Sequence, residues 1–317
     1  MTQPLPSPPS GIAGRYRINV ASIAARARRV KARTPRKARI SGSDVLLLFL
    51  IAAAAVLLVG VAFDNVSIER SRAVPPVVDA FFGLISEAGK SQWELVPSGI
   101  LVLVLLAGRW SIVPPFVRVF WAELGALAAF LFASIGGVGI IVNILKQPIG
   151  RGRPGTFDLV GVLGFEPFRL TYSFQSFPSG HAATAGALIA FGFLVMRRWR
   201  IGLMLFGLAI AASRVVVGAH YPSDIVAGLL LGYTFSLWLA HRFARRGWAF
   251  SLTETGSIRA RAACLRRGFT DPARTASIVA GLADAIWGRA VWLPAVTPGG
   301  RQPRGEIRGD RQRGIDD

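Results

Sequence analysis

The stretch that decides the fold runs from Val45 to Phe63 and reads VLLLFLIAAAAVLLVGVAF. It contains no charged residue, and its length is close to the roughly 20 residues that a helix needs to cross a bilayer. A helix that is apolar all round is stable only in lipid or inside a bundle of other apolar helices. We therefore interpret this stretch as a membrane-spanning helix.

Five more apolar segments follow, at Trp93–Gly108, Phe120–Leu145, His181–Met196, Ile201–Val217 and Asp224–Ala240. The last three are slightly short for a span, so they must borrow polar flanking residues. The chain of 317 residues is 52% hydrophobic and only 17% charged, which is too apolar for an ordinary soluble domain of this length. These features predict an all-α polytopic membrane protein built as a bundle of six transmembrane helices.

The segments divide the chain into three regions. We expect residues 1–43 to form a basic, disordered cytoplasmic arm and residues 44–246 to form the six-span domain. Residues 247–317 form a basic cytoplasmic tail, with a helix predicted over Thr275–Arg289 and disorder from Pro298 onward. Residues 64–92 are predicted as the first outer loop, with an amphipathic helix that lies at the interface or packs over the spans.

The net charge of +20 could indicate nucleic acid, but the cations flank apolar runs. This placement indicates anionic lipid and orientation signals, and we expect no nucleic-acid partner. The loop cations that fall on one side of a six-span chain are Arg109, Arg118, Arg197, Arg198, Arg200, Arg242, Arg245 and Arg246. That side is then cytoplasmic and holds both termini. The Ala-, Arg- and Gly-rich composition favours a bacterial inner membrane.

Three polar blocks interrupt the apolar chain. They are Lys146-Gln-Pro-Ile-Gly-Arg-Gly-Arg153-Pro154, Pro178-Ser-Gly-His181, and Ser213-Arg-Val-Val-Val-Gly-Ala-His220-Tyr-Pro-Ser-Asp224. The six-span topology places all three blocks on the extracytoplasmic face. Because that topology was inferred from other residues, the convergence of the blocks is an independent check. Cations can cradle an oxyanion, one imidazole can attack and another can donate a proton, so the blocks together suit phosphoryl transfer.

The third block supplies a nucleophile and its partner. The spacing from His220 to Asp224 lets the carboxylate fold back towards the imidazole, fix its tautomer and stabilise the imidazolium that forms. Arg214, on the same loop, can grip phosphate oxygens in a bidentate manner.

The other two blocks supply an acid and the remaining anion-binding groups. Ser179 and Gly180 lie at a helix N-terminus, which favours an anion, and His181 is then placed to protonate the leaving oxygen. Lys146 and Arg153 add positive charge. We expect Arg151 to be a solvated loop residue. The polar span residues Glu123 and Asn143 are given no catalytic role, and the single cysteine, Cys264, excludes a disulfide framework and a cysteine metal site.

These blocks resemble the type 2 phosphatidic acid phosphatase superfamily, whose pattern is K-x6-RP, then PSGH, then SR-x5-H-x3-D. Every position matches, and the resemblance covers about Phe120–Ala240. It implies a six-helix membrane bundle and metal-independent dephosphorylation through a phosphohistidine. By resemblance, His220 is the nucleophile, Asp224 its partner and His181 the general acid. The implied phosphate cradle consists of Lys146, Arg153, Ser179, Gly180 and Arg214. The superfamily also contains vanadium haloperoxidases, but these are soluble, and the predicted spans argue against that interpretation.

The sequence therefore predicts an integral membrane phosphatase that cleaves a lipid phosphomonoester or diphosphate without a cofactor or metal. Candidate substrates by resemblance are undecaprenyl diphosphate, phosphatidylglycerol phosphate, phosphatidic acid and lipid A phosphates. Two alternatives remain open. One is a phosphotransferase that passes the phosphoryl group to a second lipid, and the other is a non-catalytic protein that binds or translocates lipid phosphates. The sequence does not fix the oligomeric state.

Overall fold

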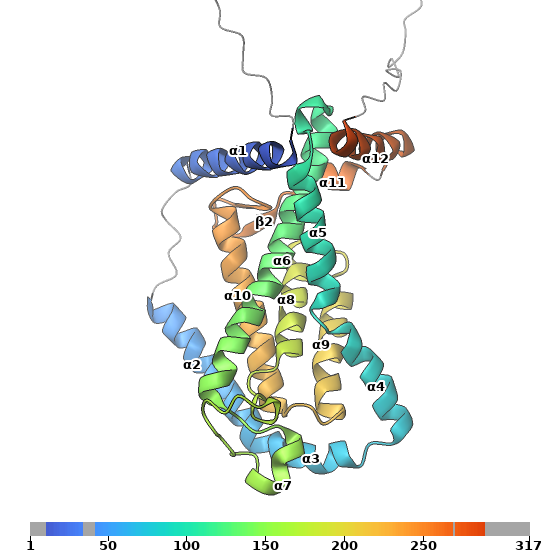
Figure 1. The fold of residues 1–317 in the computed structure, drawn as a ribbon. Helices are drawn as coiled ribbons and strands as arrows, with labels where there is room; N and C mark the ends of the chain where they lie inside the picture. The colour runs from blue at the N-terminus through green and yellow to red at the C-terminus, as the bar shows by residue number, and fades with distance from the viewer. Residues whose placement is uncertain (1–10, 34–41, 269, 289–317) are drawn as a thin grey trace, which may run out of the picture.

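The computed structural model describes residues 11–33, 42–268 and 270–288, and within them the fold is helical apart from one small antiparallel sheet (Figure 1). The helices are α1 (Ile12–Arg33), α2 (Gly42–Val59), α3 (Asn65–Arg72), α4 (Pro76–Ala88), α5 (Gln92–Ala107), α6 (Pro115–Ile149), α7 (Phe157–Val160), α8 (Gly180–Leu194), α9 (Arg200–Val216), α10 (Pro222–Ala244), α11 (Ala263–Gly268) and α12 (Pro272–Trp287). The strands are β1 (Phe250–Leu252) and β2 (Ile258–Ala260). The predicted all-α class is confirmed.

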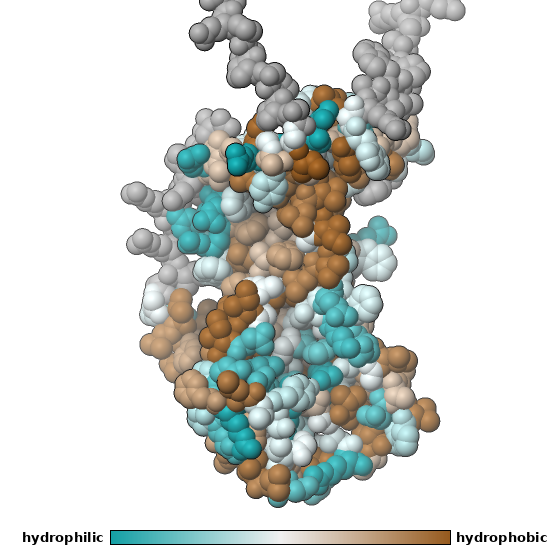
Figure 2. Space-filling view, viewed as in Figure 1, coloured by the Kyte–Doolittle hydropathy of each residue, from teal (hydrophilic) through white to brown (hydrophobic). Residues whose placement is uncertain are grey.

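All six predicted spans are helical, but they differ in length. Four continuous helical segments of the described chain are long and apolar enough to cross a membrane, namely Gly42–Arg72, Pro76–Ala107, Pro115–Ile149 and Pro222–Ala244. The helices α8 and α9 have 15 and 17 residues, so the count of six crossings stays a prediction. Figure 2 shows an apolar band on the surface over α5 and α6.

Close packing of α8 against α10 brings two of the polar blocks together. A Cβ added at Gly232 would lie 2.0 Å from the Ala183 carbonyl oxygen, and one at Gly228 would lie 2.4 Å from the Ser179 carbonyl oxygen. Only glycine at these positions lets the two backbones approach so closely, as in other small-residue interfaces between membrane helices. The N-termini of α8 and α10 therefore meet at the same end of the bundle.

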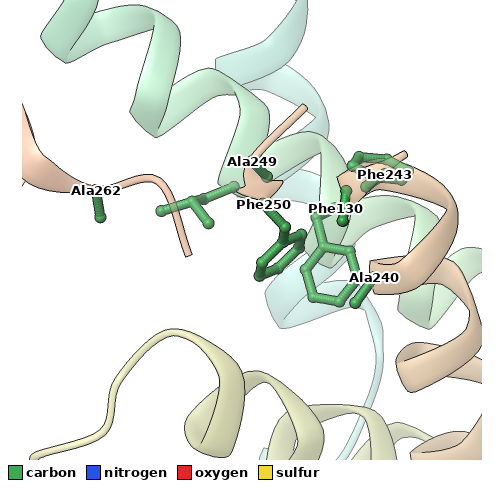
Figure 3. Close-up of a cluster of buried hydrophobic side chains, with 8 residues drawn as sticks. Phe130, Ala240, Phe243, Ala249, Phe250 and Ala262 are labelled. Carbon is green, nitrogen blue, oxygen red and sulfur yellow. The ribbon is translucent and has the colours of Figure 1, made fainter. Parts of the chain in front are cut away.

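The opposite end of the bundle is closed by residues that follow α10. The β1 residue Phe250 is fully buried and packs edge-on against Phe130 of α6, with 4.7 Å between the ring centroids. Phe243 of α10 contacts the same Phe130 ring (Figure 3). This aromatic cluster fixes the sheet against the middle of α6 and the end of α10. The helices α1 and α12 also lie at this end, far from α3 and α7 (Figure 1).

One segment differs from the expected disorder. Residues 12–33, predicted as part of a disordered arm, form α1, and its Asn19 side chain donates to the carbonyls of Leu106 and Gly108 at the end of α5. These bonds satisfy helix-end acceptors and anchor α1 against the bundle. The segment over residues 64–92, where an amphipathic helix is expected, contains α3 and α4. The helix α12 overlaps the predicted helix over Thr275–Arg289, whereas the segment from Pro298 lies outside the described residues.

Candidate active site

A tight turn after α6 folds the first polar block back under the bundle. Gly150 ends α6 in the left-handed conformation with φ of 58°, and a Cβ there would lie 1.9 Å from the Glu166 carbonyl oxygen. Any other residue would clash, so glycine is required. Three residues later, the Arg153 guanidinium donates to the carbonyls of Tyr172, Gln175 and Ala219, and it stacks 3.8 Å from the centre of the Tyr172 ring.

The Asp224 carboxylate is the centre of a buried hydrogen-bond network. Its Oδ2 accepts from the Ser176 hydroxyl at 2.6 Å and from the Tyr221 backbone N–H at 2.9 Å, and the second bond caps the start of α10. Its Oδ1 accepts from Arg151 at 2.6 Å. Asp224 is completely buried, so its negative charge is held in place by an ion pair and two further hydrogen bonds.

Arg151 connects this network to the junction between α2 and α3. One of its terminal nitrogens lies 2.8 Å from Asp64 Oδ2, and Asp64 also accepts from the backbone N–H and the hydroxyl of Ser223. Asp64 ends a π-helical turn over Gly60–Asp64 that interrupts the helix between α2 and α3. Burial acts to lower the pKa of Arg151, but the charges of Asp224 and Asp64 outweigh it, so the net shift of the pKa is upward.

His220 faces Asp224 from the loop between α9 and α10. Its Nδ1 lies 3.5 Å from Asp224 Oδ2 and 3.5 Å from the Ser176 hydroxyl, so these groups take one side of the ring. Burial of the ring lowers the pKa of His220 to about 4, although the Asp224 carboxylate acts in the opposite direction. The imidazole is therefore neutral near pH 7, and its Nε2 is the nitrogen left for chemistry.

His181 begins α8 next to this network. Ser179 caps α8 by accepting from the Ala182 N–H, and the Ser179 N–H donates to the Asp224 carbonyl at 3.1 Å. This bond ties the second polar block to the third. His181 interacts electrostatically with His220 and with Arg214, so the two imidazoles belong to one site.

Three cations surround the imidazoles. Lys146 interacts electrostatically with Arg153 and Arg214, and its ammonium group forms no ion pair or hydrogen bond within the described chain. Arg214 donates to the Ser86 hydroxyl of α4, while its Nε is buried without a partner among the described residues. Like charges held so close together are unfavourable until an anion binds between them, so the cluster is suited to a phosphate group.

A cavity of about 290 Å³ opens beside His181. Lys146 and Gly180 lie on its wall together with His181, and the corner between α4 and α5 closes the other side. The complete lining is Gly89, Lys90, Ser91, Gln92, Gly139, Val142, Asn143, Lys146, Gly180, His181 and Thr184. The site is therefore accessible from the side of His181.

Comparison with known proteins identifies the family. The PAP2 superfamily matches residues 127–248. A lipid A 1-phosphatase of Rhizobium johnstonii is 37% identical over 202 residues, which cover 64% of this chain and 82% of the relative. The chain belongs to the PAP2 superfamily.

Two further similarities were found for this PAP2 protein. A lipid A 1-phosphatase of Rhizobium etli is 36% identical over 182 residues, covering 57% of this chain and 78% of that protein. A crystal structure of a PAP2-type phosphatidylglycerolphosphate phosphatase from Bacillus subtilis superposes with a TM-score of 0.45 at 24% identity, covering 62% of this chain and 92% of the other. Because its relatives are phosphatases, this PAP2 protein is a phosphoric ester hydrolase. Its long apolar helices make it a multi-pass membrane protein.

The structure brings every predicted site residue of the PAP2 protein to one end of the bundle. These residues are Lys146, Arg153, Ser179, Gly180, His181, Arg214, His220 and Asp224. The prediction for Arg151 is wrong. This residue is not solvated but 5% exposed, because two carboxylates neutralise its charge inside the protein.

Sequence reasoning also missed Asp64, Ser176 and Ser223, which complete the network around Asp224. Ser176 and Ser223 carry no signal in the sequence, because serine is common in loops and at helix starts. Asp64 does carry a signal, since a carboxylate that directly follows an apolar run of span length is expensive to bury and needs a partner.

Proposed function

We propose that this PAP2 protein hydrolyses a lipid phosphomonoester at the extracytoplasmic face of the inner membrane through a phosphohistidine on His220. The observation that carries the proposal is the uncompensated positive charge around the imidazoles. Asp224 is the carboxylate that faces His220, and it shares Arg151 with Asp64, so these three buried groups together carry one negative charge. Lys146, Arg153 and Arg214 carry three positive charges and form no ion pair within the described chain, so positive charge is in excess here and a phosphate group can balance it.

The reaction has two displacement steps. His220 Nε2 attacks phosphorus, the bond from phosphorus to the lipid oxygen breaks, and His181 gives its proton to that oxygen. Asp224 stabilises the positive charge that develops on the His220 ring. Water then attacks the phosphohistidine and gives a proton to His181, which frees inorganic phosphate and restores both histidines.

Lipid A 1-phosphate is the substrate that we propose. The relatives from Rhizobium johnstonii and Rhizobium etli are both named lipid A 1-phosphatases, and each match covers more than three quarters of the relative. Undecaprenyl diphosphate, phosphatidylglycerol phosphate and phosphatidic acid are the comparison substrates. Phosphate release from this panel by the purified protein tests the choice, and a preference for another member contradicts it.

The general acid role of His181 is tested with two leaving groups. General acid catalysis contributes roughly 10²–10⁴ in rate, and a leaving group that is already a stable anion needs less of it. His181→Ala should therefore lose much more rate on an alkyl phosphate than on p-nitrophenyl phosphate, and His220→Ala should be inactive on both. Equal losses on the two substrates in His181→Ala would remove this residue from the acid role.

The phosphotransferase alternative differs only in what attacks the phosphohistidine. Product analysis with and without an acceptor lipid separates the two, because a transferase yields a phosphorylated acceptor in place of inorganic phosphate. A protein that only binds or translocates lipid phosphates would bind the lipid but release no phosphate.

A further inference from the structure

We propose that the cavity beside His181 binds the hydroxyl-rich head group of the departing lipid alcohol, a sugar, through the side-chain amides of Asn143 and Gln92. This inference rests on the proposed function, because it uses His181 as the proton donor to the leaving oxygen. It assigns Asn143 and Gln92, which the sequence left without a role, to substrate recognition.

The position of the cavity determines which part of the substrate enters it. In an in-line displacement the leaving oxygen lies opposite the attacking nitrogen. His181 lines the cavity, whereas His220 is only 3% exposed and does not. The space next to the proton donor is therefore on the leaving-group side, and the group attached to the leaving oxygen occupies it.

The corner between α4 and α5 belongs to the same site. A Cβ added at Gly89 would lie 3.2 Å from the His181 ring, so the corner touches the proton donor directly. Three residues before it, Ser86 accepts a hydrogen bond from Arg214. The far wall of the cavity is thus attached to the phosphate-binding cations.

Two neutral hydrogen-bonding side chains line the cavity, Asn143 from α6 and Gln92 from the start of α5. The Asn143 and Gln92 amides form no hydrogen bond with another part of the described chain, so both are available to a ligand. Lys90 is paired with Glu87 at 2.6 Å, which neutralises its charge. Neutral amides match the hydroxyls of a sugar better than a second phosphate or an acyl chain, because each hydroxyl can both donate and accept.

The size of the cavity limits it to one head group. Its volume of about 290 Å³ is just below the roughly 300–1,000 Å³ that is typical of small-molecule sites. The acyl chains of the lipid must remain outside, in the bilayer.

Gly139 allows the cavity to be filled without disturbing the protein. It lies on the cavity wall in α6, and a Cβ added there meets no atom within 4 Å. Gly202 in α9 is a matched control, because it is also helical and open but lies outside the cavity. Gly139→Leu and Gly202→Leu should therefore fold alike, since a helical glycine in open space gains helix propensity when replaced.

The experiment compares kcat/KM of these variants on three substrates: lipid A 1-phosphate, phosphatidic acid and p-nitrophenyl phosphate. We expect Gly139→Leu to lose at least tenfold on lipid A 1-phosphate and to stay within twofold of wild type on p-nitrophenyl phosphate. Gly202→Leu should be unchanged on all three. Equal losses of Gly139→Leu on all three substrates, or none on the glycolipid, would overturn the assignment of the cavity.

Asn143→Ala and Gln92→Ala test the sugar chemistry itself. Each should lower kcat/KM on lipid A 1-phosphate by roughly threefold to tenfold, the usual effect of one lost hydrogen bond, and leave phosphatidic acid unaffected. Asn65→Ala, at an exposed amide of α3, is the control. An equal loss on phosphatidic acid would show that the cavity does not select a sugar. If wild type releases phosphate from none of the substrates, it is the proposed function that fails.

Discussion

Arg151 lies between two buried carboxylates, 2.8 Å from Asp64 and 2.6 Å from Asp224. Removing one member of a buried ion pair typically costs about 3–5 kcal/mol, because the remaining charge stays buried without a partner. Here the loss of the guanidinium would leave two carboxylates unpaired beside the nucleophile. Arg151 is therefore a positioning residue, which acts on the reaction through Asp224.

We predict that Arg151→Lys lowers both kcat and the melting temperature, with little change in KM. Lysine keeps the charge, but it cannot reach Asp64, Asp224 and Ser223 at once as the planar guanidinium does. Thermal unfolding in detergent and kinetics on p-nitrophenyl phosphate measure the two effects. Arg169→Lys, in an exposed ion pair with Glu166, is the control and should change neither. An unchanged kcat in Arg151→Lys would contradict the positioning role.

The pH dependence of the reaction follows from burial of His220. The neutral ring is the nucleophile, and the pKa of His220 is lowered from 6.5 to about 4. The nucleophilic, neutral form of His220 is therefore present above this lowered pKa, and it is lost by protonation as the pH falls through about 4. We predict that kcat/KM of His181→Ala on p-nitrophenyl phosphate, which needs little general acid catalysis, stays nearly constant from pH 7 to about pH 5 once it is corrected for the ionisation of the substrate. A half-maximal point near 6.5 on the acid side would contradict the effect of burial.

At the scale of elements, the packing of α8 against α10 sets the distance between the two histidines. The carbonyl oxygen of Ser179 would lie only 2.4 Å from a Cβ added at residue 228, so the two backbones are in contact next to the site. We predict that Gly228→Ala pushes α8 away and lowers kcat/KM about 100-fold, the loss expected for a misplacement of about 1 Å. Gly202→Ala is the control and should be silent. Wild-type kinetics in Gly228→Ala would show that the contact does not set the site.

Sequence reasoning predicted these elements well where the signal was local. Apolar runs located the helices, and the spacing from His220 to Asp224 placed the carboxylate beside the ring at 3.5 Å. It failed where the decisive contact joins distant parts of the chain. The partners of Arg151 include Asp64, which is 87 positions away, and no local pattern in the sequence relates these two residues.

At the scale of the whole molecule, the helices place α1 and α12 at one end and the candidate site at the other (Figure 1). Together with the basic loops, this arrangement leads us to propose that both ends of the described chain face the cytoplasm and that the site faces outward. In a background with Cys264→Ser, cysteines introduced at Asp158 and Arg198 should react with impermeant reagent from opposite sides of sealed vesicles. Labelling from the same side would refute the six-span topology.

Trapping the phosphoenzyme shows whether His220 carries the phosphoryl group. His181→Ala, the wild type and His220→Ala are mixed with [³²P]p-nitrophenyl phosphate and quenched rapidly with base, in which phosphohistidine is stable. We expect label on a peptide that contains His220 in the wild type and in His181→Ala, and none in His220→Ala. Label in His220→Ala, or label on His181, would rule out His220 as the nucleophile.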